Sequence, residues 1–228
     1  MNGGASIELI PRAAISLALM AGLALAPDAF CWPARLPAEQ FLSLPQVVER
    51  TLEFHFNGRS PGGPPGLVTG QSSDKPRRQA LSEFVAGLPV ASPFKRSSGV
   101  FVTLSRAGKS RACWGSVFAE QPDLVKATVY ATLGALKKEY RYAPVKRNEW
   151  KLLKPQVTVV QAVEPIPGLA AQNPLRDGLM VRSGGKAAVL LPGEARDAYY
   201  QLVQCKLKAG IRPGEPCQLY SIKAQVYD

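Results

Sequence analysis

The sequence predicts an α+β fold, with a mostly antiparallel sheet built from hairpins and flanked by helices. Segments 99–115 and 177–191 each contain two short apolar runs joined by a glycine-containing turn. Segments 123–140 and 194–209 instead carry apolar residues at helical spacing. Strands paired by tight turns, with helices inserted between them, are typical of this fold class.

The hairpin at 99–115 is the most informative stretch. Aliphatic residues recur at every second position from 100 to 104, the period of a half-buried strand. Residues 107–109, Ala-Gly-Lys, supply the turn, because glycine tolerates positive φ. Strict alternation along the return strand then places Arg111 and Cys113 on the same face, which makes this face the first place to look for chemistry.

The N-terminal region differs in composition from the rest. Residues 13–26 are uncharged and apolar, the length of a signal-peptide core and shorter than the roughly 20 residues of a membrane-spanning helix. We expect 1–29 to be a signal peptide or N-terminal membrane segment and 30–44 a linker, so that the protein is exported or membrane-tethered. The alternatives are a buried apolar helix or a start codon assigned too far upstream, and then a cytoplasmic location.

The domain itself is expected to span residues 45–228. Pro45 suits a first helical turn, and apolar residues four apart predict a helix that ends at Asn57-Gly58. Residues 59–78 are rich in Gly, Pro and Ser and predict a flexible loop, followed by a short helical or extended piece at 79–87.

The second half of the chain alternates between strands and helices. Asp123 begins the strongest helix, and Gly210 closes the helix that carries Cys205 on its apolar face. Gly184-Gly185 forms the turn of the second hairpin. Further strands are predicted at 157–163 and 217–227, where β-branched residues or period-two alternation recur.

Composition narrows the classes of function. The net charge of +11 makes this a basic protein that attracts anions, but its cations are scattered and no aromatic-laced RNA-binding signature is present, so nucleic acid is not the expected partner. Four cysteines without a CxxC pair and a single histidine, His55, argue against a metal site. In an oxidising compartment Cys205 and Cys217 could form a disulfide, although the sequence does not fix the pairing.

Six motifs in order resemble one family. They are GVFVTL at 99–104, R-x-C-x-G at 111–115, an aromatic-Arg-aromatic turn at 140–142, TVVQAVEPI at 158–166, DGLMVRSGGKAAVLLP at 177–192 and CKLKAGI at 205–211. Together they resemble the AMMECR domain family over roughly residues 45–226. The resemblance implies an α+β fold around an antiparallel sheet. It implies no settled activity or cofactor, although family members are linked to Memo-like and radical-SAM proteins in the AmmeMemoRadiSam grouping.

The family's L-R-G-C-I-G signature falls on residues 110–115. Arg111, Cys113 and Gly115 match it, whereas the Ser, Ala and Trp at 110, 112 and 114 depart from it. The family's D-x-R-F turn falls on 139–142, where Arg141 is kept and an aromatic follows it; depending on the alignment, either Glu139 or no residue takes the place of the Asp.

Two functions follow as hypotheses. The first is a binding or accessory module at the cell envelope, in which Arg111, Thr103 and Arg141 hold an anionic small molecule or protein partner and the N-terminal segment makes the only membrane contact. The alternative is a cysteine-dependent enzyme with Cys113 as nucleophile and Arg111 as its electrostatic partner. Nothing in the sequence places a histidine base beside Cys113. A buried structural role for this thiol is the other possibility. Whether the protein is an enzyme, and with what cofactor, is left undecided.

Overall fold

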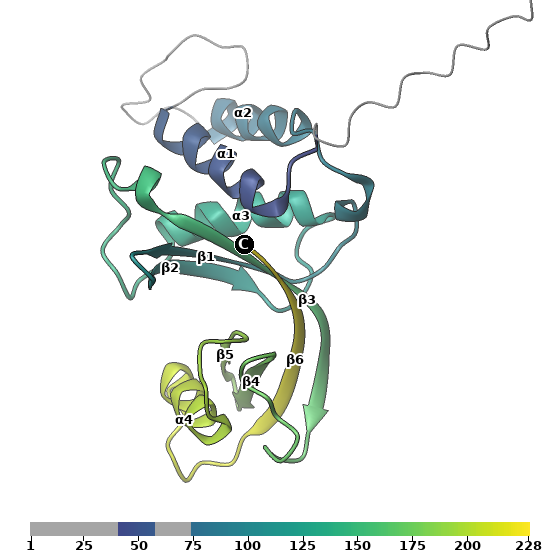
Figure 1. Ribbon diagram of the computed structural model, residues 1–228, viewed down its shortest axis with the longest axis vertical. Coiled ribbons are helices and arrows are strands. Elements are labelled where there is room, and N and C mark those ends of the chain that lie inside the picture. The colour runs from purple at the N-terminus through teal and green to yellow at the C-terminus, as the bar shows by residue number, and fades with distance from the viewer. Residues whose placement is uncertain (1–40, 58–73) are drawn as a thin grey trace, which may run out of the picture. The chain divides into compact units, whose positions relative to one another are not determined.

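The structure is built on one sheet of six antiparallel strands in the order β2-β1-β3-β6-β4-β5 (Figure 1). It is a computed structural model that describes residues 41–57 and 74–228. The elements are α1 Leu44–Asn57, α2 Asp74–Ala86, η2 Ser92–Phe94, β1 Val100–Arg106, β2 Lys109–Ser116, α3 Leu124–Lys137, η3 Trp150–Leu152, β3 Lys154–Ile166, β4 Asp177–Ser183, β5 Lys186–Leu190, α4 Ala198–Ala209 and β6 Gln218–Tyr227. The α+β class with an antiparallel sheet is therefore confirmed.

Both predicted hairpins are present. In the first, Ala107 and Gly108 form the two-residue turn, with φ of 49° and 74°, and Lys109 already belongs to β2. The predicted strand at 157–163 is longer than expected, because β3 continues through Pro155 and Pro165 near its two ends. β3 and β6 are the two long central strands, and they pair with each other from Val157 to Ile166.

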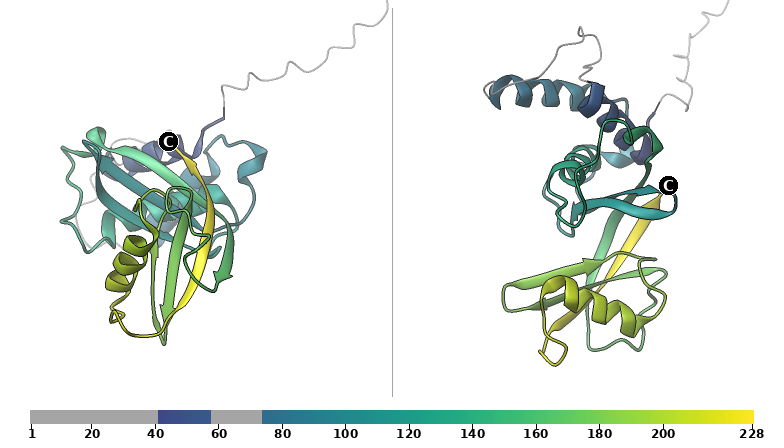
Figure 2. Two further views of the ribbon diagram at one scale, coloured as in Figure 1. Left: turned by 60° about the horizontal axis from the view of Figure 1, so that its bottom comes forward. Right: turned by 90° about the vertical axis from the view of Figure 1, so that its left-hand side faces the viewer.

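The helices cover the sheet in two places. α1 and α3 pack on β1, β2 and β3, where they bury a cluster that includes Leu52, Val102 and Leu124 (Figures 1 and 2). α4 packs on β4 and β5, where Leu179 and Cys205 belong to a second cluster. The predicted core position of Cys205 is confirmed, since its side chain is fully buried.

The sheet curls toward the face that lies away from α1 and α3, which is therefore its concave side. Phe101 points away from α3 and belongs to a cluster with Met180 and Ile222, which lie on β4 and β6. The sheet therefore brings the two ends of the strand order toward each other on its concave side, and every second residue of β1 and β2 faces that side.

Three predicted boundaries differ from the structure. The predicted loop ran to residue 78, but α2 begins at Asp74, because Pro76 falls in the first turn, where a missing N–H costs nothing. α4 begins at Ala198 rather than 194, because the Asp197 side chain caps it by accepting from the N–H of Tyr200 at 2.7 Å. α3 ends at Lys137 rather than 140.

Several predictions fall on residues 1–40 and 58–73, which lie outside the described residues. These are the signal peptide or membrane segment at 1–29, most of the linker at 30–44 and most of the loop at 59–78. Within the described residues, no helix has both the length and the apolar character that a bilayer crossing requires.

Candidate functional site

Cys113 lies opposite Thr103 on the concave face of the sheet. The two residues are partners in the β1–β2 register, and the Thr103 hydroxyl donates to Cys113 Sγ at 3.4 Å. Burial raises the pKa of the Cys113 thiol, and the Thr103 hydrogen bond and the charges of Lys208 and Arg141 offset only part of that rise. The thiol is therefore protonated near neutral pH, which is the opposite of what a cysteine nucleophile requires.

The chain's single histidine lies on the other side of the sheet from Cys113. His55 belongs to α1, which packs against α3 and β3 on the convex side of the sheet. Cys113 points to the opposite side, since its neighbours Ala112 and Trp114 pack toward α3. The structure does not bring the imidazole and the thiol together.

A carboxylate covers the edge strand beside Cys113. Glu139 accepts the backbone N–H of Cys113 at 3.1 Å and binds the Arg141 guanidinium through both oxygens, at 2.9 and 2.6 Å. The hydrogen bond from Arg141 lowers the pKa of Glu139 to about 2, and Glu139 in turn raises the pKa of Arg141. The guanidinium of Arg141 is thus held at the β2 edge by an internal partner.

Arg111 does not lie beside Cys113 as strict alternation predicted. The β1–β2 register passes from Leu104↔Ala112 to Ser105↔Ser110, so Arg111 is the extra residue of a β-bulge. Bulges redirect a side chain, and Arg111 turns to the carboxylate of Glu149, with N–O distances of 2.8 and 3.4 Å. The structure therefore separates the predicted Arg111–Cys113 pair, and Arg111 anchors the segment that follows α3.

Glu149 organises the end of the first hairpin. It is buried, and it accepts from Arg106, from Arg111 and from the N–H of Lys146. Burial alone would raise its pKa, but the Lys146 N–H and the Arg111 side chain outweigh that effect and lower it. The carboxylate is therefore ionised, and it holds the β1–β2 turn against residues 144–151.

The two segments that this buried carboxylate joins carry several exposed cations. Arg106 lies opposite Lys109 in the β1–β2 register. The neighbouring Ser105 lies opposite Lys154 in the β1–β3 register. Segments 105–111 and 144–154 contain seven basic residues and one acid, Glu149. We call the exposed members of this set the hairpin patch: Arg106, Lys109, Lys146, Arg147, Lys151 and Lys154.

The sequence analysis assigned neither of the two glutamates to the site and did not predict the patch. Glu139 stands where the family signature has an acid, which was a usable signal, whereas Glu149 lies in an irregular segment that carries no motif. The patch combines two segments that are far apart in the sequence, so no single run of charges predicted it. Cys113, Cys205 and Cys217 are free thiols. Across 41–57 and 74–228 the structure holds no group of three or more His, Cys, Asp or Glu side chains arranged for a metal ion.

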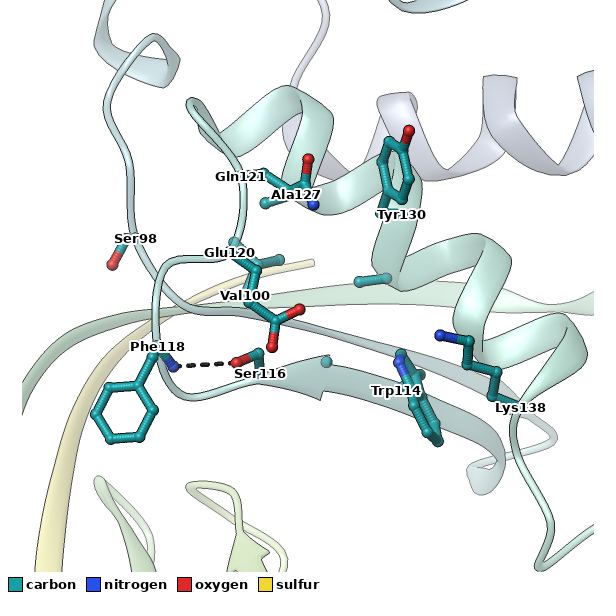
Figure 3. A pocket seen from close by; sticks show the side chains of 12 residues that line it. Ser98, Val100, Trp114, Ser116, Phe118, Glu120, Gln121, Ala127, Tyr130 and Lys138 are labelled. Carbon is teal, nitrogen blue, oxygen red and sulfur yellow. Dashed lines mark hydrogen bonds between the residues drawn. The ribbon is translucent and has the colours of Figure 1, made fainter. Parts of the chain in front are cut away.

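A small pocket lies on the other side of β2, beside α3. Trp114 and Ser116 of β2, together with Tyr130 of α3, line it, and its volume is about 100 Å³ (Figure 3). Cys113 does not line this pocket, so the pocket and the concave face are separate features.

Comparisons with known proteins agree with this architecture. The model of the AMMECR1 family matches residues 71–228. A protein of Methanothermobacter thermautotrophicus is 31% identical over 182 residues, which cover 69% of this chain and 93% of that protein. Protein PF1979 of Pyrococcus furiosus is 32% identical over 148 residues, 57% of this chain and 70% of that protein.

A solved structure supports the same conclusion. The crystal structure of uncharacterized protein PH0010 from Pyrococcus horikoshii is similar with a TM-score of 0.62 and 25% identity, and the match covers 80% of this chain and 88% of that one. The fold, the matched signature residues and the extent of the family match all agree: this chain belongs to the AMMECR1 family.

Proposed function

We propose that this protein is a non-catalytic binding module that holds a multiply charged anionic partner on the hairpin patch. The observation that supports this function is a set of six exposed cations on the two segments that the buried carboxylate of Glu149 joins, 105–111 and 144–154. Glu149 accepts from Arg106, Arg111 and the Lys146 N–H, so Arg106 is the patch cation whose side chain it is shown to pair with.

The patch suits an extended anion better than a single carboxylate. Its cations come from the β1–β2 turn, the start of β3 and segment 146–151, and they are spread over a surface rather than gathered in a pocket. Interactions of this kind are screened within about 8–10 Å at physiological ionic strength, so affinity depends on several charges acting together. Arg111 supports the surface through its ion pair with Glu149.

The cysteine enzyme has less support. The pKa of the Cys113 thiol is raised, Arg111 is turned toward Glu149, and His55 lies beyond the sheet. Thr103 and Cys113 form a hydrogen-bonded pair on the concave face, a contact that packing alone explains.

The test uses a fluorescein-labelled peptide of ten glutamates and follows its anisotropy with the full chain. Changing Lys109→Glu together with Lys154→Glu should weaken binding at least tenfold, which is about 1.4 kcal/mol. The matched control is Lys95→Glu with Arg96→Glu, an equal change of charge on exposed residues before the start of β1, away from the turn. Competition with inorganic tripolyphosphate separates a small-anion site from a peptide site.

The outcome that contradicts the proposal is equal weakening by both pairs of substitutions. Binding would then follow the net charge of +11 and not the patch.

We also propose that the module works at the cell envelope. The support is the apolar run at 13–26, whose length and composition are those of a signal-peptide core. N-terminal sequencing of the mature protein tests this, because export with cleavage removes the first 29 residues or nearly so. A soluble product that still begins at Met1 would contradict it.

A further inference from the structure

Helix α4 carries an apolar surface on the side that faces away from the sheet. Gln201 and Cys205 are fully buried, and their side chains donate to carbonyl oxygens of β4. Tyr199, Tyr200 and Leu207 are instead 70%, 54% and 60% exposed. In Figures 1 and 2 no other described helix or strand lies over the outer side of α4. The packing of the domain therefore does not account for these three side chains.

The exposed residues belong to one stripe along the helix. Because an α-helix turns by about 100° per residue, four apolar or aromatic residues fall within an arc of about 100°. They are Tyr199, Tyr200, Val203 and Leu207, and we call them the α4 stripe. Cys205 points about 190° away from the middle of that arc, so the stripe lies opposite the buried side. Polar residues usually occupy this side of a surface helix.

Positive charge accompanies the α4 stripe. Residues 198–213 include no Asp or Glu, and their charged members are Lys206, Lys208 and Arg212. The Lys206 ammonium donates to two carbonyls of the loop after α4, at 3.0 and 2.8 Å, and the Lys208 ammonium donates to a carbonyl of β5 at 2.7 Å. Carbonyl oxygens orient these ammonium groups without cancelling their charge. The helix is therefore complementary to a negatively charged surface.

The acids that flank this segment have partners within the domain. Asp197 caps α4 by accepting the Tyr200 N–H at 2.7 Å, and Glu194 accepts a backbone N–H at 2.8 Å. Glu215 pairs with Lys186 at 3.3 Å. All three lie before or after the helix, so the α4 stripe itself contains no negative charge.

A bilayer surface suits this combination of charge and apolar area. The stripe is a convex ridge, and fluid lipid takes up a ridge without needing a matching groove. Tyrosine rings favour the depth of the lipid headgroups, leucine favours the edge of the acyl chains, and lysine side chains reach phosphate groups from alongside. α4 has 12 residues, far fewer than the roughly 20 that span a bilayer, so it would lie along the surface.

We propose that α4 docks on an anionic phospholipid bilayer, with the helix axis parallel to the membrane and the α4 stripe in the headgroup region. Lys206, Lys208 and Arg212 then lie beside lipid phosphates. This contact belongs to the folded domain and is additional to the one expected of the N-terminal segment. It needs an anionic leaflet but neither export nor the hairpin patch, so it goes beyond the proposed function.

The test places a tryptophan on the stripe of the full chain, Tyr200→Trp. The vesicles contain equal parts of phosphatidylglycerol and of phosphatidylcholine brominated in its acyl chains. Bromine quenches tryptophan only at short range, so the fluorescence added to that of the wild type reports contact at this one position. The expected result is quenching of the added fluorescence and an emission shift to shorter wavelength. Vesicles without phosphatidylglycerol should lose at least half of the quenching.

Two controls locate the contact. Tyr130→Trp, at an exposed position on α3, should show no added quenching. Tyr199→Ser with Leu207→Ser, combined with Tyr200→Trp, removes apolar surface at constant charge and should lose at least half of the quenching, while urea unfolding shows an unchanged fold. Because the readout is local, vesicle binding through the N-terminal segment alone gives no quenching on α4.

Equal quenching of Tyr130→Trp and Tyr200→Trp would overturn the proposal, and so would quenching that survives the loss of the stripe or that is absent from Tyr200→Trp. A dimer of this chain that Tyr199→Ser with Leu207→Ser dissociates would assign the stripe to a second copy and would overturn it too. Failure of the polyglutamate peptide to bind the hairpin patch leaves all of these outcomes unchanged.

Discussion

The contacts of Glu139 with Arg141 and with the Cys113 N–H form a clamp at the β2 edge. Replacing Glu139 with glutamine should remove the charge of this clamp while leaving an oxygen for the Cys113 N–H. The pKa of Glu139 falls from its ordinary 4.5 to about 2 because Arg141 donates to both carboxylate oxygens. At about 1.4 kcal/mol per pKa unit, this shift corresponds to at most about 3 kcal/mol of folding free energy. The Arg141 side chain is 35% exposed, so solvent screening reduces the expected loss to about 2 kcal/mol.

The pH dependence follows from the sign of the shift. A carboxylate with a lowered folded-state pKa stabilises the protein fully above pH 4.5 and loses that contribution as the pH falls toward 2. Urea unfolding from pH 7 to pH 2 should therefore show a gap of about 2 kcal/mol between the wild type and Glu139→Gln at pH 7, which closes toward pH 2. Glu120→Gln, at an exposed site, is the control.

A double-mutant cycle isolates the pair. If the Arg141 contact is the source, Arg141→Met and Glu139→Gln should show a coupling free energy of about 2 kcal/mol at pH 7. A gap that persists at pH 2, or additive effects of the two substitutions, would refute this account of the clamp.

Three further predictions come from the structure. Gly134→Ala should destabilise the protein by about 1–3 kcal/mol in urea unfolding although alanine favours helix, because its Cβ would lie 2.1 Å from the Trp114 ring; a gain in stability would contradict this contact. Cys113 should react with a thiol reagent at pH 7 much more slowly in the folded protein than in urea, since burial raises its pKa, and equal rates would show an exposed thiolate. Ala107→Asn should raise the free energy of unfolding by about 0.5–1 kcal/mol in urea unfolding, because Ala107 has a φ of 49° that asparagine tolerates better; an unchanged free energy would argue against strain at the turn.

The local patterns of the sequence predicted most of the fold. Period-two alternation identified β1 and β2, helical spacing identified α1 and α3, and Gly210 ended α4 in the left-handed conformation, with a φ of 68°. These features depend on neighbouring residues, which is why they can be recognised without a structure.

The site was harder to predict because its contacts are long-range. A bulge at Arg111 breaks the alternation on which the predicted Arg111–Cys113 face rested, and no residue in the strand signals the bulge. The partner of Arg111 is 38 residues away at Glu149, and the partner of the Cys113 N–H is 26 residues away at Glu139. Alternation gives the direction of a side chain, but it does not reveal what the side chain meets.

The central position of β6 has a consequence for synthesis and folding. β6 pairs with β3 on one side and β4 on the other, so it is the only strand of the described sheet that joins the β1–β3 part to the β4–β5 part. It is also made after all the other strands. During translation the β1–β3 part, with α1 and α3, can form while β3 keeps an unpaired edge, and the completed sheet waits for residues 218–227 to leave the ribosome. Chaperone contact should therefore concentrate on β3 in nascent chains that end before β6.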